Sequence, residues 1–75
     1  MKTITIMLKS IDDVKNLVNL TARYSFDIDL CSHRYVVDGK SIMGVLSLDH
    51  SKPIEVTIHS DDCDELLEAL KAFAC

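Results

Sequence analysis

The sequence predicts an α+β fold in which helices cover one face of a four-stranded, mainly antiparallel sheet. Three observations support this prediction. Short segments alternate apolar and polar residues, two longer segments carry apolar residues at helical spacing, and the elements follow the order βαββαβα. Alternating strands have one apolar face, and amphipathic helices are the economical cover for it. We therefore expect an open-faced two-layer sandwich.

The first strand and the first long helix occupy the amino-terminal third. Residues 3–8 alternate polar and apolar residues and are rich in β-branched side chains, which is typical of a strand with Ile4, Ile6 and Leu8 facing inward. Ser10 then precedes a helical pattern that should reach Arg23. Its hydroxyl can accept an unpaired backbone N–H, and acidic residues in the first turn suit the positive end of a helix. The expected apolar stripe of this helix comprises Ile11, Val14, Leu17, Val18 and Thr21.

Two strands and a short helix are expected in the middle of the chain. Residues 26–30 alternate cleanly, residues 31–34 should form a turn, and residues 35–37 should return as the third strand. Asp38 and Gly39 supply turn chemistry after it. Residues 41–48 are predicted to form a short, mostly apolar helix with Ser41 as its N-cap.

A fourth strand and a last helix complete the predicted fold. Residues 54–59 alternate as a strand, residues 60–62 should cap the helix, and Lys71 should complement its negative end. The apolar stripe of this helix is expected to comprise Cys63, Leu66, Leu67, Leu70, Phe73 and Ala74. The open face of the sheet would present to water Thr3, Thr5, Asp27, Asp29, Glu55, Thr57 and His59.

Composition excludes several classes of function. A chain of 75 residues with 48% hydrophobic residues is expected to form a single globular domain. The net charge of −4 and the lack of a basic cluster argue against nucleic-acid binding. Cys31, Cys63 and Cys75 form no CxxC pair, so we expect free thiols and neither a metal nor a cofactor. No signal-peptide core or membrane-length apolar run is present, which predicts a cytoplasmic protein.

Residues 40–48 carry a specific family resemblance. Their sequence, Lys-Ser-Ile-Met-Gly-Val-Leu-Ser-Leu, resembles the regulatory-serine helix of HPr from low-GC Gram-positive bacteria. HPr is the histidine-containing phosphocarrier protein of the bacterial sugar phosphotransferase system. From Thr21 onward the resemblance runs without an obvious gap and includes the predicted strand at residues 54–58. It implies an HPr-like fold and a protein that is not an enzyme.

The amino-terminal part departs from the family pattern where the phosphocarrier histidine is expected. The family places this histidine at the start of the first helix, in Gly-[Leu/Ile]-His-[Thr/Ala]-Arg-Pro-Ala. Here a shortened loop leads to Ser10 at the histidine position, Asp12 at the arginine and Asp13 at the proline. Imidazole forms a readily transferred phosphoramidate, whereas a serine phosphate is a stable ester, and nearby acids oppose phosphorylation. We therefore predict a degenerate phosphocarrier position.

The other histidines offer no obvious replacement. His33 is expected in a hairpin turn, His50 in a loop and His59 at a strand end. None begins a long helix beside an arginine, so each is interpreted as a polar surface residue. We expect the phosphocarrier activity to be absent.

The resemblance makes Ser41 the candidate regulatory phosphorylation site. In the family a dedicated kinase phosphorylates this serine, and a phosphate is favoured at a helix amino end. Ser41 could equally act only as a cap, worth about 1 kcal/mol. Part of the short helix must face the core, with Val45 the first candidate, and its remaining apolar residues should form a partner surface. The residues assigned to partner binding are Lys40, Ile42, Met43, Val45 and Leu46.

Three functions remain open at this point. The favoured one is an HPr-like regulator that binds a serine kinase, another phosphotransferase-system protein or a transcriptional regulator through residues 41–48. The second is an interaction module in which Ser41 is never modified. The third is a phosphocarrier that uses an unexpected residue. In each case we expect a monomer or a weak dimer that binds neither nucleic acid nor membrane.

Overall fold

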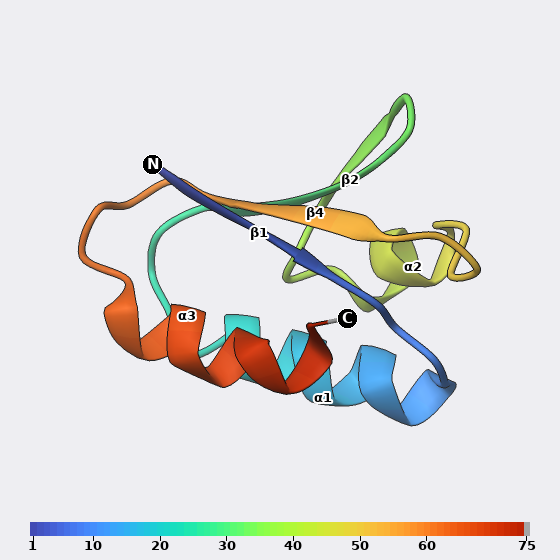
Figure 1. The fold of residues 1–75 in the computed structure, drawn as a ribbon, viewed down its shortest axis with the longest axis horizontal. Coiled ribbons are helices and arrows are strands. Elements are labelled where there is room, and N and C mark those ends of the chain that lie inside the picture. Colours follow the sequence, from blue (N-terminus) through green and yellow to red (C-terminus); the bar gives the residue numbers. More distant parts are fainter. Residues whose placement is uncertain (75) are drawn as a thin grey trace.

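The computed structural model describes residues 1–74 and has the predicted α+β architecture. In Figure 1 the sheet forms one layer, and α1 and α3 lie together on one of its faces. The elements are β1 (Lys2–Ile6), α1 (Ile11–Thr21), β2 (Ile28–Ser32), β3 (Tyr35–Asp38), α2 (Ile42–Leu46), β4 (Ile54–Ile58), α3 (Asp64–Leu70) and a 3₁₀ turn (Lys71–Phe73).

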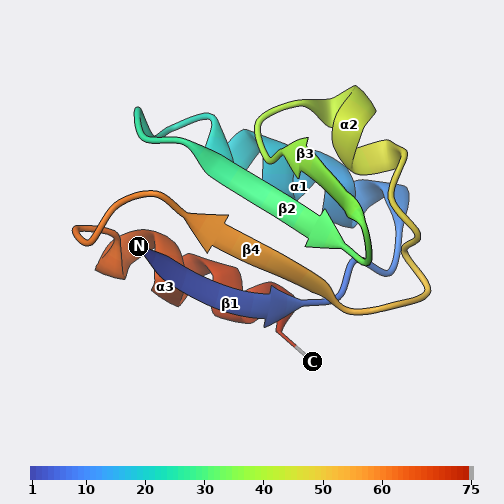
Figure 2. The same ribbon diagram turned by 90° about the horizontal axis from the view of Figure 1, so that it is seen from above.

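The sheet has the strand order β1-β4-β2-β3, and all neighbouring strands are antiparallel. Figure 2 shows β4 between β1 and β2, with β3 outermost on the side of α2. Val56 in β4 lies opposite Ile4 of β1 and Leu30 of β2. Since strand side chains alternate between faces, this register directs the apolar residues of all three strands toward the helices.

The core fills the space between the sheet and the helices. Val14, Leu17 and Thr21 are the buried residues of α1, and Leu66 and Leu70 are those of α3. Each set follows the spacing of one helix face, as the sequence predicted. The buried apolar residues are Ile6, Leu8, Val14, Leu17, Ile28, Leu30, Val45, Leu48, Ile54, Val56, Ile58, Cys63, Leu66 and Leu70.

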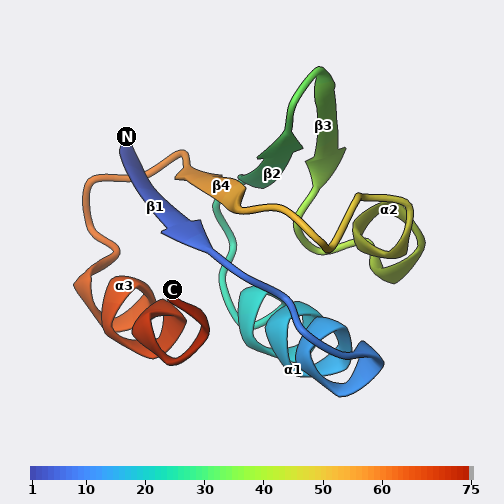
Figure 3. The ribbon, with the colours of Figure 1, turned by 45° about the vertical axis from the view of Figure 1, so that its right-hand side comes forward.

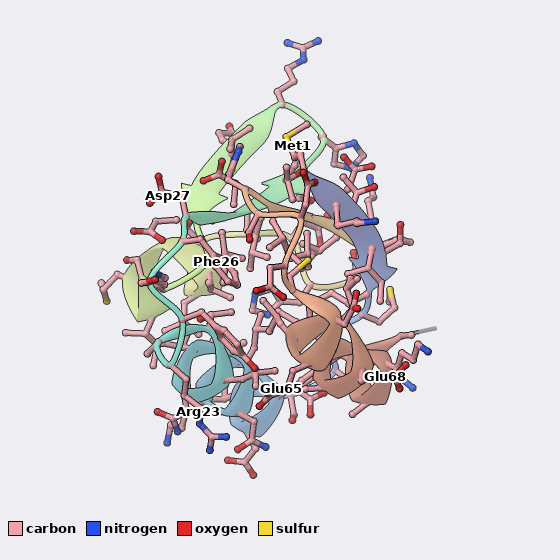
Figure 4. All side chains as sticks on the ribbon, turned by 90° about the vertical axis from the view of Figure 1, so that its left-hand side faces the viewer. Met1, Arg23, Phe26, Asp27, Glu65 and Glu68 are labelled. Atoms are coloured by element: carbon pink, nitrogen blue, oxygen red, sulfur yellow. The ribbon has the colours of Figure 1, made fainter. Side chains whose placement is uncertain are left out.

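The connection from α1 to β2 is longer than the sequence pattern suggested. α1 ends at Thr21 rather than Arg23, and β2 begins at Ile28 rather than at Phe26. Phe26 instead packs its ring against that of Tyr24, with ring centroids 5.3 Å apart, and contacts the core. Figure 4 views this end of the molecule, with Phe26 on the inner side of the connection. Alternation alone could not distinguish a strand residue from an aromatic anchor in a loop.

The β2–β3 turn is tighter than predicted. Cys31 and Ser32 belong to β2, so only His33 and Arg34 remain as the loop. His33 has φ 57°, the left-handed conformation that short hairpin turns require. The two-residue loop fixes the register, with Ser32 opposite Tyr35.

The start of α3 differs from the predicted cap at residues 60–62. Cys63 is the N-cap residue, and its side chain makes no capping hydrogen bond. The Ser60 hydroxyl instead accepts the Asp62 N–H at 3.1 Å, while the Asp61 carboxylate pairs with the amino-terminal ammonium group. Cys63 is itself buried, with 2% of its surface exposed.

The carboxyl end of α3 passes into the 3₁₀ turn. Lys71 begins that turn, and its ammonium group contacts Glu68 Oε1 at 2.8 Å. The sequence predicted that Lys71 would complement the negative helix end, whereas the observed partner is a side chain.

The surface departs from the sequence pattern in a few places. Ile11, which was expected in the apolar stripe, is 63% exposed, whereas Val14 three residues later is buried. Asp29 and Thr57 on the open face of the sheet are half-buried rather than exposed. Cys31 and Cys63 are free thiols, and Cys75 lies outside the described residues. Within residues 1–74, no helix is long and apolar enough to cross a bilayer.

Candidate functional site

The amino end of α1 is closed by its own side chains. Ser10 is the N-cap, and its hydroxyl accepts the Asp13 N–H at 3.2 Å. Asp13 in turn accepts the Lys9 N–H at 2.9 Å. Asp12 is exposed beside them, so two carboxylates occupy the first turn. These groups satisfy backbone donors and favour the positive helix end, which is a capping role.

The three imidazoles belong to other elements. His33 lies in the β2–β3 turn, as predicted. His50 lies in the loop after α2, where its Nε2 is 2.8 Å from the Val45 carbonyl oxygen at the end of that helix. His59 follows β4, and its Nε2 is 2.7 Å from Asp29 Oδ2.

Ser41 lies at the amino end of α2, as the sequence predicted. It is half-buried, and its hydroxyl accepts the Gly44 N–H at 3.2 Å. Asp38 fixes the turn before it, because its carboxylate accepts the Lys40 N–H at 2.9 Å and its carbonyl accepts the Ser41 N–H at 3.0 Å. These hydrogen bonds therefore fix the position of Ser41 at the start of the helix.

A second set of contacts holds this turn to the rest of the molecule. Gly39 donates its N–H to the Ile28 carbonyl at 2.7 Å, and its own carbonyl accepts the Thr21 hydroxyl at 2.7 Å. A Cβ at Gly39 would lie 2.9 Å from the Ile28 oxygen, so glycine permits this close approach. From its spacing in the sequence, Thr21 was expected only as part of the apolar stripe of α1. A hydroxyl within that stripe was the available signal for this contact.

The exposed residues of α2 form a small surface, which we call the α2 apolar surface. It comprises Ile42, Met43 and Leu46, which are 39%, 76% and 41% exposed. Lys40 lies half-buried just before it. Val45 has no exposed area, which confirms it as the core-facing residue of the short helix and makes its place among the partner-binding residues wrong. In a helix of five residues one side must face the sheet, and Val45 is on that side.

The loop that follows α2 is ordered by local hydrogen bonds. The Asp49 carboxylate accepts the Ser51 hydroxyl at 2.6 Å and the Ser51 N–H at 3.0 Å. These bonds hold the pKa of Asp49 below its ordinary value, with the hydroxyl bond the largest cause. Residues 1–74 contain no pocket and no cluster of three metal-ligating side chains. What this region offers is a surface rather than a cavity.

Comparison with known proteins places this architecture in a family. The family model described as "PTS HPr component phosphorylation site" matches residues 13–74, a range that contains Ser41 and α2 but begins after Ser10 and Asp12. HPr-C-His from Thermoanaerobacter tengcongensis is 28% identical, with a TM-score of 0.81 over 96% of this chain and 89% of that one. The phosphocarrier protein HPr from Bacillus anthracis strain Ames is 29% identical, with a TM-score of 0.75 over 99% and 94%. The chain therefore belongs to the HPr family of the phosphotransferase system.

Proposed function

We propose that this protein is a regulatory HPr that binds a partner protein through α2 and carries no phosphate on a histidine. Its family consists of phosphocarrier proteins of the phosphotransferase system, which are not enzymes. The regulatory role and the loss of the carrier histidine are the proposal. We also propose that the chain acts as one domain and works in the cytoplasm.

The observation that carries the proposal is the amino end of α1. A serine hydroxyl already accepts a backbone N–H there, and two aspartates lie in the same turn. A phosphoryl relay needs a nucleophile whose phosphorylated form is easily transferred, which imidazole provides and a serine ester does not. It also needs positive charge beside the phosphate, whereas Asp12 and Asp13 supply negative charge.

The α2 apolar surface supports a binding role. Ile42, Met43 and Leu46 are adjacent and exposed, and such clusters on small proteins often mark partner sites. Met43 is a flexible and polarizable contact residue. The proposed partner is an HPr serine kinase, a phosphotransferase-system protein or a transcriptional regulator.

Serine phosphorylation at Ser41 is the proposed regulation of this surface. The hydroxyl is half-buried and bonded to the Gly44 N–H, so the kinase would have to release this bond before transfer. The phosphate would then lie directly beside Ile42, at the margin of the α2 apolar surface. Adding close to two negative charges there should change which partners bind.

Incubation with an HPr serine kinase and ATP tests this regulation. We expect one phosphate on the natural chain, none on Ser41→Ala, and one on the matched control Ser47→Ala. Ser47 is exposed and lies at the other end of α2, where its hydroxyl donates to the Gly44 carbonyl. A natural chain that gains no phosphate, or a Ser41→Ala chain that gains as much, contradicts regulation at Ser41.

Incubation with phosphoenolpyruvate and the first enzyme of the phosphotransferase system tests the loss of the carrier role. We expect no acid-labile phosphate on this chain, while an ordinary HPr in the same tube should be labelled. An acid-labile label here would contradict the proposal and identify a phosphocarrier with an unexpected residue. Mapping that label among His33, His50 and His59 would then show which one carries it.

A further inference from the structure

The two edges of the sheet are not equally available to another chain. At the outer edge of β1, Ile6 forms a bridge with Ala74, and the Met7 N–H donates to the Phe73 carbonyl at 2.8 Å. The carboxyl-terminal segment therefore protects the end of that edge. β3 is the other edge strand, and β2 is its one strand neighbour among the described residues.

The hydrogen-bond pattern identifies which backbone groups of β3 point outward. The Gly39 N–H bonds to the Ile28 carbonyl, so these two residues form a hydrogen-bonded pair. Hydrogen-bonded and non-bonded pairs alternate along an antiparallel ladder, which makes Val36 and Asp38 non-bonded toward β2. The N–H and C=O of Val36 and the N–H of Asp38 therefore point away from the sheet. The Asp38 carbonyl already accepts the Ser41 N–H at 3.0 Å.

The side chains along this edge combine exposed apolar residues with opposite charges at the two ends. Tyr35 and Val36 are 72% and 63% exposed. Arg34 precedes them and Asp38 follows them, so opposite charges bracket the strand. Within the sheet Asp38 lies directly opposite Asp29, a like-charge pair that a nearby cation would relieve.

We propose that β3 pairs antiparallel with β3 of a second copy of this chain, about a two-fold axis at Val36. Val36 then bonds with Val36 of the second copy, Tyr35 lies opposite Val37, and Arg34 lies opposite Asp38. A two-fold axis produces each contact twice, so both Asp38 carboxylates gain an arginine. The product is one continuous sheet across the two molecules.

The backbone pattern and the charges together select this register. Outward-pointing residues must oppose outward-pointing residues, so the two-fold axis must pass through a residue rather than between two residues, which leaves Tyr35, Val36 and Val37 as possible centres. Moving the axis to Tyr35 places Arg34 opposite Val36, and moving it to Val37 places Asp38 opposite Val36. Either shift leaves the charged residues without opposite partners. Centring on Val36 uses the available donors and matches both ends of the strand.

The shape of the molecule permits this pairing. Figures 1 and 3 show the β2–β3 hairpin extending away from the layer formed by α1 and α3. α2 contacts β3 near its end, where a Cβ on Gly44 would lie 3.2 Å from the Val37 Cβ. A four-residue edge buries little area, so we expect a dissociation constant on the order of 100 µM to 1 mM.

A proline substitution tests the edge directly. Val36→Pro removes an N–H that points away from β2 and so leaves the β2–β3 bonds intact, while Val36→Thr keeps this N–H and a β-branched side chain. In sedimentation velocity from about 10 µM to about 1 mM, the natural chain and Val36→Thr should dimerise with rising concentration. Val36→Pro should raise the dissociation constant at least about tenfold, with circular dichroism confirming the fold.

Charge reversal provides a test that does not depend on proline. Arg34→Asp should weaken association at least about tenfold, and the double variant R34D/D38R should restore it to within about threefold. Association should also weaken as salt screens the charges. In the natural dimer the Val36 amide should exchange with solvent more slowly at high protein concentration, whereas the Val37 amide is protected at every concentration.

Several results would overturn this pairing. A natural chain that stays monomeric at about 1 mM in low salt excludes it, even if a peptide from another protein binds the β3 edge. Dimers that persist unchanged in Val36→Pro exclude it as well. Dimers that are lost on changing β1 but not on changing Arg34 or Val36 would assign the interface to the opposite edge.

Discussion

The hydroxyl of Thr21 on α1 donates a buried hydrogen bond to the carbonyl of Gly39, with 2.7 Å between the two oxygens. This bond joins the carboxyl end of the first helix to the turn that leads into Ser41. The residues between them include the whole of β2 and β3, so the contact fixes the start of α2 from a distant part of the sequence.

Removing that hydroxyl should destabilise the protein. Thr21→Val keeps the shape of the side chain but leaves the Gly39 carbonyl without its donor, and an unpaired buried carbonyl costs about 1–3 kcal/mol. We expect a loss of this size in the free energy of unfolding measured with urea. Thr21→Ser keeps the hydroxyl and should lose less. Equal stability of Thr21→Val and the natural chain would show that the bond contributes nothing net.

Gly39 should be the glycine that tolerates substitution least. In Gly39→Ala the new Cβ would meet the Ile28 backbone oxygen at 2.9 Å, and backbone cannot move as easily as a side chain. We expect a destabilisation of about 1–3 kcal/mol in urea unfolding. Gly44→Ala is the comparison, because its tight neighbour is the Val37 side chain and alanine favours the helix by about 1 kcal/mol. A larger loss at Gly44 than at Gly39 would contradict this ranking.

Val45 and Met43 should separate stability from binding. Val45 is fully buried, so Val45→Ala should leave a cavity and lower stability by about 1–3 kcal/mol. Met43 is 76% exposed, so Met43→Ala should change stability by less than about 0.5 kcal/mol. Thermal unfolding measures both changes in stability. Met43→Ala should instead weaken the affinity for the HPr kinase or regulator, and an unchanged affinity would contradict the α2 apolar surface as the binding site.

The pairing of Asp61 with the amino terminus should appear as a pH effect. The hydrogen bond from the terminal ammonium group is the largest cause that lowers the pKa of Asp61, followed by the charge of that group. A pKa lowered by folding stabilises the folded state above the ordinary aspartate pKa, and this contribution is lost as pH falls through the folded value. NMR titration should therefore show Asp61 below an ordinary aspartate. Acetylating the terminus should remove the shift, and an unchanged titration would disprove the contact.

Local patterns in the sequence were sufficient for most of the fold. Alternation located the strands, helical spacing located α1 and α3, and the Ser10 and Ser41 caps are hydrogen-bonded as their positions suggested. These features depend on neighbours a few residues apart, which a sequence displays directly. The resemblance at residues 40–48 supplied the family, and the family match over residues 13–74 confirms it.

The candidate site was only partly visible in the same patterns. The position of Ser41 at the start of α2 was predictable, because capping is local. Val45 was the first candidate to face the core and is buried, but a five-residue helix has too few turns to show from the sequence which of its other apolar residues stay exposed. The exposure of Ile11 was missed because helical spacing shows which side of α1 faces inward but not how far the sheet extends over it.

The sequence by itself determined the order of elements, their apolar faces, the capping serines and the acidic first turn of α1. The tertiary structure decided which helix residues are covered, that Thr21 reaches Gly39, that the buried Cys63 is the N-cap of α3, and that β3 forms an edge between Arg34 and Asp38. The physical reason is the separation in sequence over which each interaction acts. Helix propensity, capping and alternation act between residues close in the chain, whereas burial and strand neighbours exist only after distant segments have packed together.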